Sequence, residues 1–133
     1  LAGMMGKLVA GIFVILGHVF PVYFGFRGGK GVLVGATMLV FLDWRIFLVA
    51  LVLFVIAVAL TRWVSLGSIL GAISFPITMQ VFYGDARLSV VAALMAAAVV
   101  FMHRSNIKRI LSGTENRFSF HSKPQIHDDA DQK

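Results

Sequence analysis

Residues 46–60 read Ile-Phe-Leu-Val-Ala-Leu-Val-Leu-Phe-Val-Ile-Ala-Val-Ala-Leu, a run with no polar or charged side chain. At a rise of about 1.5 Å per residue, such a run is slightly shorter than the ~20 residues that cross a membrane. Four further apolar segments flank it, at residues 1–16, 31–42, 66–82 and 88–102. We therefore expect an all-α, polytopic integral membrane helix bundle with short, partly broken spans that extend into their flanking loops.

The overall composition agrees with a membrane protein. Hydrophobic residues make up 59% of the 133 residues and charged residues 14%, whereas soluble chains carry about 25% charge. We expect residues 1–118 to form one transmembrane domain of about five segments. Residues 119–133 are polar and lack a periodic apolar face, so we expect a cytoplasmic tail without fixed structure. The segment 31–42 could instead be a partly inserted or broken helix that lines a cavity.

Short connections make successive loops alternate between the two sides of the membrane. One side then receives residues 17–31, 61–67 and 103–133, with nine cations, and the other receives residues 43–45 and 83–87, with two. The positive-inside rule assigns the first side to the cytoplasm. We expect a multi-pass protein of a bacterial cytoplasmic (inner) membrane, with its motif loops and C-terminus facing the cytoplasm.

The connection 17–31 is the most polar of these loops. It contains His18, Arg27, Lys30 and five glycines, among them the run Gly28-Gly29-Lys30-Gly31. Bare backbone N–H groups beside cations suit a phosphate. The alternative is a flexible turn whose cations contact lipid headgroups. It is not a nucleotide P-loop, because the required upstream glycine and the hydroxyl residue after the lysine are absent.

Two further polar clusters fall on the same side. Ser65 and Ser68 begin the fourth segment, where a hydroxyl either caps the helix or contributes to a phosphate site. His103 and Asn106 lie three residues apart, hence on one face of a helix that can continue to Ser112-Gly113. A basic juxtamembrane helix end would explain the neighbouring cations without any catalytic role.

Several classes of chemistry are excluded or disfavoured. The chain has no cysteine, and its histidines and acids lack the spacing of metal ligands, so we expect no metal and no cofactor. The cations do not form an aromatic-interleaved basic face, so we expect no nucleic-acid partner. A Ser-His-Asp nucleophile set cannot be assembled.

Taken in order, the motifs resemble one family. Gly17-His18-x-Phe20-Pro21 with Gly28-to-Val32, then Val64-to-Ile69, then His103-Arg104-x-Asn106-Ile107 with Gly113-to-Asn116 are similar to the bacterial acyl-phosphate:glycerol-3-phosphate acyltransferases of the PlsY type. These are multi-span membrane enzymes of phospholipid synthesis. They transfer an acyl group from acyl phosphate to the sn-1 hydroxyl of glycerol 3-phosphate and form lysophosphatidate.

The resemblance implies roles for particular residues. Gly28, Gly29, Lys30 and Gly31, with Arg27, would bind the phosphate of glycerol 3-phosphate, and Ser65 and Ser68 would help to hold it. His103, Asn106 and His18 would be the catalytic residues. The partners implied are glycerol 3-phosphate, acyl phosphate and membrane lipid.

The chain departs from the family pattern in two places. Leu33-Val34 replace the usual Ala-Thr after the glycine loop, and the family's first motif with its leading span has no counterpart. We therefore expect an N-terminally truncated sequence, whose activity alone is an open question. The alternatives to an enzyme are a small polytopic transporter or channel subunit, with glycine-broken helices along a translocation path, and an assembly or anchor protein.

Overall fold

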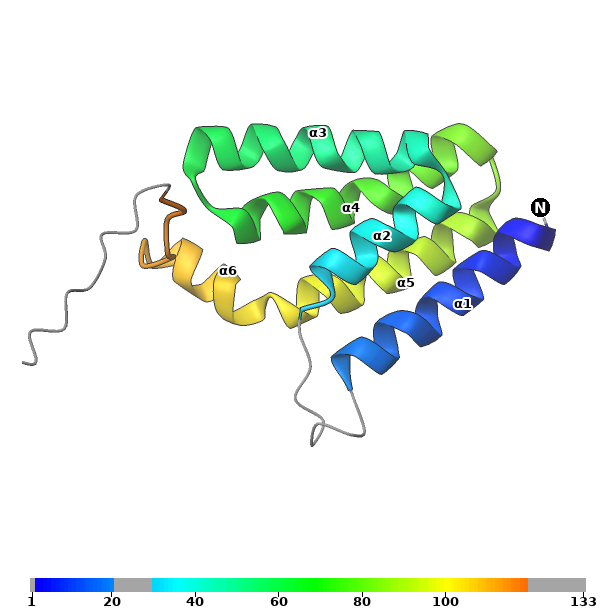
Figure 1. Cartoon of the computed structure of the whole chain (residues 1–133), viewed down its shortest axis with the longest axis horizontal. Coiled ribbons are helices and arrows are strands. Elements are labelled where there is room, and N and C mark those ends of the chain that lie inside the picture. The colour runs from blue at the N-terminus through cyan, green and yellow to red at the C-terminus, as the bar shows by residue number, and fades with distance from the viewer. Residues whose placement is uncertain (1, 21–29, 120–133) are drawn as a thin grey trace, which may run out of the picture.

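The computed structural model describes residues 2–20 and 30–119, and within these ranges all regular structure is helical (Figure 1). The helices are α1 (Ala2–Val19), α2 (Val32–Leu42), α3 (Trp44–Thr61), α4 (Val64–Tyr83), α5 (Ala86–Met102) and α6 (Arg104–Leu111). The expected all-α fold class is confirmed. The fragment Arg27–Gly29 of the glycine loop and nearly all of the tail lie outside the described residues.

The helices have the lengths expected of short and broken membrane spans. By length and composition, α3 and α4 can each cross a membrane, and α5 with α6 forms a third candidate that is bent by 60°. The segment Gly3–Val19 of α1 and the helix α2 are apolar but fall short of that length, and α2 has only 11 residues. The aromatic and charged residues Trp44 and Arg45 extend α3 beyond the apolar run, as the sequence leads one to expect.

From α2 to α5, successive turns lie at opposite ends of the bundle, as expected for helices joined by short connections. Figure 1 shows α3, α4 and α5 as antiparallel neighbours, with α2 crossing beside α3 and α1 outermost. The turn from α3 to α4 lies at one end of the bundle, together with α6; we call it the α6 end. The turns from α2 to α3 and from α4 to α5 lie at the opposite end, which we call the Asp43 end.

Small residues allow α3 and α4 to approach closely. A Cβ atom added to Gly67 would lie 2.8 Å from Phe54 Cδ2 and 3.0 Å from the Phe54 carbonyl oxygen, so glycine is required there. Close backbone contact of this kind replaces the hydrophobic effect as the packing force within lipid. The outer face of α3 exposes the large apolar side chains that lipid would cover: Leu48, Val52, Leu53, Val55, Ile56 and Leu60.

Candidate active site

A buried carboxylate joins three elements at the α6 end of the bundle. Glu115 Oε1 accepts the Ser65 hydroxyl at 2.5 Å and Asn106 Nδ2 at 2.7 Å, and its Oε2 accepts Arg109 Nε at 2.8 Å. The segment after α6 is also fixed by its backbone, because Phe118 N donates to the Arg62 carbonyl at 2.8 Å. Groups 50 residues apart in sequence are thereby held in one cluster, which we call the Glu115 cluster: Ser65, Asn106, Arg109 and Glu115.

The cluster keeps Glu115 ionised. Burial raises the pKa of the Glu115 carboxyl, but hydrogen bonds from Ser65, Asn106 and Arg109 outweigh burial and lower the pKa to about 2. The ionised carboxylate can only accept hydrogen bonds, so it turns the Asn106 amide with its NH₂ group towards Glu115. The other end of that amide is the oxygen Oδ1. Asn106 is only 4% exposed, so Oδ1 is shielded from water, and it has no hydrogen-bond partner among the described residues.

His103 lies one helical turn before Asn106, at the bend between α5 and α6. It is 1% exposed, and its Nδ1 lies 2.8 Å from the Val99 carbonyl oxygen. Because a carbonyl oxygen only accepts, Nδ1 is the donor in this contact, so the tautomer that fits it carries its lone pair on Nε2. Among the described residues, no hydrogen bond to Nε2 occurs.

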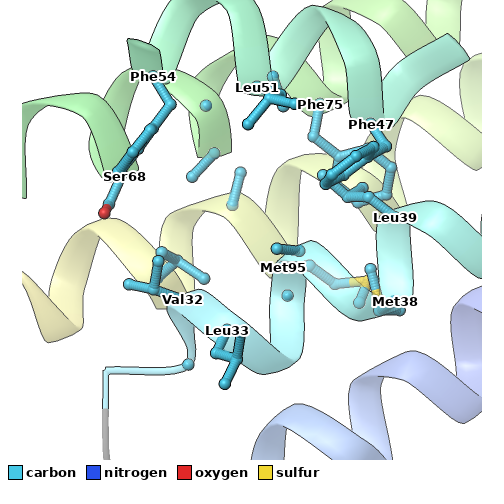
Figure 2. A pocket seen from close by; sticks show the side chains of 18 of the residues that line it. Val32, Leu33, Met38, Leu39, Phe47, Leu51, Phe54, Ser68, Phe75 and Met95 are labelled. Atoms are coloured by element: carbon cyan, nitrogen blue, oxygen red, sulfur yellow. The ribbon is translucent and has the colours of Figure 1, made fainter. Parts of the chain in front are cut away.

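The start of α2 faces this region across an apolar cavity of about 340 Å³. Figure 2 shows Ser68 and Phe54 on one side of the cavity, and Val32 and Leu33 on the other. Val99, whose carbonyl holds His103, also contributes to the wall. The lining is otherwise apolar, so this cavity suits a hydrocarbon chain.

Gly31 sets the geometry at the start of α2. It has φ = +74°, in the left-handed region that favours glycine, and its carbonyl accepts Gly35 N at 2.7 Å in the first helical turn. Lys30, just before it, is exposed. The N-terminal N–H groups of α2 therefore follow a cation in sequence, which favours an anion at this point.

The structure brings together some of the residues predicted from the sequence. Ser65 and Asn106 meet at Glu115, His103 lies one turn from Asn106, and Ser68 and Gly31 line the cavity. His18 is exposed on the last turn of α1 and makes no hydrogen bond with a described residue. Arg27, Gly28 and Gly29 lie outside the described residues.

Ser65 and Ser68 do not cap α4. The N-cap is Trp63, whose side chain makes no capping hydrogen bond, while Ser65 donates to Glu115 and Ser68 donates to the Val64 carbonyl at 3.0 Å. Sequence reasoning missed Glu115 and Arg109 as members of the site. The available signal was an acidic residue in an otherwise basic segment, directly after the Gly113 turn.

The chain matches a known protein family. Residues 1–113 match the profile of a family described as "Glycerol-3-phosphate acyltransferase". The chain belongs to the glycerol-3-phosphate acyltransferase family. The resemblance derived from the motifs is thereby confirmed.

The curated relatives are longer than this chain. The glycerol-3-phosphate acyltransferase of Chlorobaculum parvum is 40% identical over 86% of this chain and 59% of its own length, and that of a Thermoanaerobacter species is 38% identical over 88% and 59%. The chain thus spans 59% of the length of these relatives.

Solved structures of the family have the same fold. PlsY, described as an integral membrane glycerol 3-phosphate acyltransferase, matches in its glycerol 3-phosphate form with a TM-score of 0.79 and 32% identity, over 84% of this chain and 56% of that chain. Its lysophosphatidic acid form matches with a TM-score of 0.75 and 29% identity, over 88% and 67%. The chain is therefore a membrane protein of this family.

Proposed function

We propose that the chain forms part of a membrane enzyme that transfers an acyl group from acyl phosphate to glycerol 3-phosphate and forms lysophosphatidate. The observation that carries the proposal is the Glu115 cluster. Among the described residues, its Asn106 Oδ1 is buried and has no hydrogen-bond partner, and His103 lies one helical turn away. Ser68, one turn after Ser65, and Val99, whose carbonyl contacts His103, line the apolar cavity. Membership of the glycerol-3-phosphate acyltransferase family supports the same activity.

The phosphate of glycerol 3-phosphate would bind at the start of α2. Gly31 there begins a helix whose free N–H groups attract anions, and Lys30 adds a positive charge. Arg27, Gly28 and Gly29 complete the same sequence motif and would contribute further charge and backbone donors. Ser65 and Ser68 begin α4 at the same end of the bundle. Their hydroxyls donate to Glu115 and to the Val64 carbonyl, so each hydroxyl would have to rotate to donate to the phosphate.

The acyl chain of the donor would occupy the apolar cavity. The cavity begins beside Gly31 and Val32 and continues between α2, α3, α4 and α5 towards Phe47 (Figure 2). With the acyl chain inside the cavity, the acyl carbonyl would lie at the cavity mouth, near the anion-binding start of α2. This arrangement brings the two substrates together without a covalent enzyme intermediate, which an already activated acyl phosphate does not require.

The reaction is a displacement at the acyl carbon. The sn-1 hydroxyl oxygen forms a bond to the carbonyl carbon, the bond from that carbon to the phosphate oxygen breaks, and inorganic phosphate leaves with the electron pair. The hydroxyl proton passes to His103, His18 or a phosphate oxygen. The lone pair that the Val99 contact leaves on His103 Nε2 supports His103.

The orientation of the bundle in the membrane is inferred from the distribution of positive charge and from the location of the soluble substrate. Of the twelve cations, nine fall on the side that also contains the α6 end. We propose that this end faces the cytoplasm of a bacterial inner membrane, where soluble glycerol 3-phosphate is available. Both acyl phosphate and product would exchange with the surrounding lipid.

A direct assay tests the proposal. The chain, reconstituted in lipid, is incubated with labelled glycerol 3-phosphate and either acyl phosphate or acyl-CoA, and lysophosphatidate is measured. We expect product with acyl phosphate. A longer family member is the positive control, and absence of product from this chain with both donors, in an assay in which the control forms lysophosphatidate, would overturn the proposal.

Two variants test the assigned roles. Lys30→Ala should raise the KM for glycerol 3-phosphate, because it removes a phosphate contact, while His103→Ala should lower kcat. Lys108→Ala serves as the matched control, because Lys108 is an exposed cation of α6 outside the cluster. Wild-type kinetics for both test variants would contradict the site assignment.

A further inference from the structure

A second hollow lies between α1 and α2, on the opposite side of α2 from the cavity. It has a volume of about 760 Å³ and is open to the outside of the bundle. We call it the α1–α2 groove; one face of α1 and one face of α2 line it: Lys7, Ala10, Gly11, Val14, Leu33, Val34, Thr37, Met38, Phe41 and Leu42. It shares Leu33 and Met38 with the cavity, so α2 separates the two spaces.

The groove is apolar except at Lys7 and Thr37. Lys7 Nζ donates to the Phe41 carbonyl at 3.4 Å, at the end of α2 where the last carbonyls carry partial negative charge. That long contact uses one of three ammonium protons, and no acidic side chain pairs with Lys7 among the described residues. Lys7 is exposed, so a lipid phosphate outside the bundle can reach its ammonium group. A cation without an acidic partner among the described residues, at one end of an apolar groove, suits an anionic headgroup.

The dimensions of the groove favour a lipid. From Leu33 to Leu42 the α2 face is about 14 Å long at 1.5 Å per residue, which matches one leaflet of a hydrocarbon core about 30 Å thick. Its floor is closed, because a Cβ atom on Gly11 would lie within contact distance of the Met38 side chain. Phe41 is two residues before Asp43, and Lys7 contacts the Phe41 carbonyl, so a headgroup bound there lies at the Asp43 end and would direct its acyl chain towards the middle of the membrane.

We propose that the α1–α2 groove binds an anionic phospholipid of the leaflet at the Asp43 end. The phosphate contacts Lys7, and one acyl chain lies along the groove past Thr37 and Met38. Thr37 Oγ1 donates to the Leu33 carbonyl at 3.0 Å, so it is satisfied within its helix and can lie beside a hydrocarbon chain. The site lies at the opposite end from the Glu115 cluster and is independent of the proposed acyl transfer.

Native mass spectrometry of the full chain tests the site, with phosphatidylglycerol and phosphatidylcholine as probes. We expect one phosphatidylglycerol to bind preferentially, and Lys7→Gln to weaken that binding about fivefold, the usual effect of one basic residue on anionic lipid. Lys7→Arg should retain the affinity. Lys108→Gln, which removes an exposed cation at the α6 end, should leave it unchanged.

A variant that fills the groove distinguishes a groove site from attraction to surface charge. Thr37→Phe leaves Lys7 in place but occupies the path of the acyl chain, so it should also reduce phosphatidylglycerol binding, with helicity by circular dichroism as the check on folding. Unchanged binding in Lys7→Gln or in Thr37→Phe would overturn the proposal. An equal loss of phosphatidylglycerol binding in Lys108→Gln would overturn it as well. So would a dimer in which a second copy of the chain occupies the groove and is not displaced by phosphatidylglycerol.

Discussion

The two ends of the bundle each hold a buried carboxylate, and the partners of the two carboxylates differ. At the Asp43 end, Asp43 accepts Arg45 Nη2 at 2.7 Å, the Arg45 backbone N–H at 2.9 Å and the Tyr83 hydroxyl at 2.7 Å. Hydrogen bonds from Arg45 hold the pKa of Asp43 well below its usual range. This end is a closed connection, because Asp43 both begins α3 and ties it to the end of α4.

The α6 end uses the same kind of carboxylate to present other groups. Glu115 takes partners from α4 and α6, and it leaves Asn106 Oδ1 buried without a partner among the described residues. Around Asp43, by contrast, the described residues contain no such unsatisfied buried atom. At the Asp43 end the hydrogen bonds of the carboxylate serve only to stabilise the turn. At the α6 end they also orient a neighbouring side chain, Asn106, whose oxygen remains available as an acceptor for a substrate.

Removal of Glu115 should have the largest effect. Glu115→Ala leaves the nearly buried Ser65 and Asn106 without their acceptor, and each unsatisfied buried group costs roughly 1–3 kcal/mol. We expect the free energy of unfolding to fall by about 3 kcal/mol, with acyl transfer at least tenfold lower. Unfolding by a denaturing detergent and the lysophosphatidate assay measure the two effects.

The conservative variant separates charge from shape. Glu115→Gln keeps an oxygen that can accept from Ser65 or Asn106 but loses the attraction to Arg109, so we expect an intermediate stability. A Glu115→Ala protein as stable as wild type would contradict the role of the cluster as the connection between α4 and α6.

The sequence predicted the helices well and this cluster only in part. The apolar runs located α3 and α4 because helices that cross a membrane are predominantly apolar over about 20 residues. Ser65 and Asn106 were selected through motifs, but their meeting at Glu115 depends on packing across 50 residues, which no local spacing encodes. The 60° bend at His103 was also unforeseen, since the basic run after His103 continues a helical pattern.

The second-largest effect should be a loss of folding stability at acidic pH, which arises from Glu115 at the α6 end. The folded state holds the pKa of Glu115 at about 2, below the ordinary value of 4.5, so the unfolded state binds the proton more tightly. The stability from Glu115 is therefore complete above about pH 5 and decreases as the pH falls through 4.5 towards 2, with a loss of about 2 kcal/mol at pH 3. The difference between unfolding curves of wild type and Glu115→Gln measures it, and a difference that does not change with pH would contradict it.

A smaller loss of stability, without loss of activity, is expected at the other end. Asp43→Ala removes the N-cap of α3 and the acceptor of Tyr83, but Tyr83 is only half-buried and can be solvated. We expect a cost of about 1–2 kcal/mol and an unchanged KM for glycerol 3-phosphate. Unfolding by a denaturing detergent measures the stability, and the lysophosphatidate assay measures the KM. A kinetic defect comparable to that of Glu115→Ala would contradict the different roles proposed for the two ends.

The smallest effect should come from the ion pair at the start of α5, which has the same Asp-x-Arg pattern as Asp43 and Arg45. Arg87 Nη2 lies 3.1 Å from Asp85 Oδ2 at the start of α5, but the Arg87 side chain is 80% exposed. Water screens such a pair and replaces its hydrogen bonds, and exposed pairs often contribute nothing measurable. Arg87→Ala should therefore leave the unfolding midpoint and the kinetics unchanged. A destabilisation as large as that of Asp43→Ala would mean that ion pairing at this end matters more than burial, which would reverse the explanation given for both carboxylates.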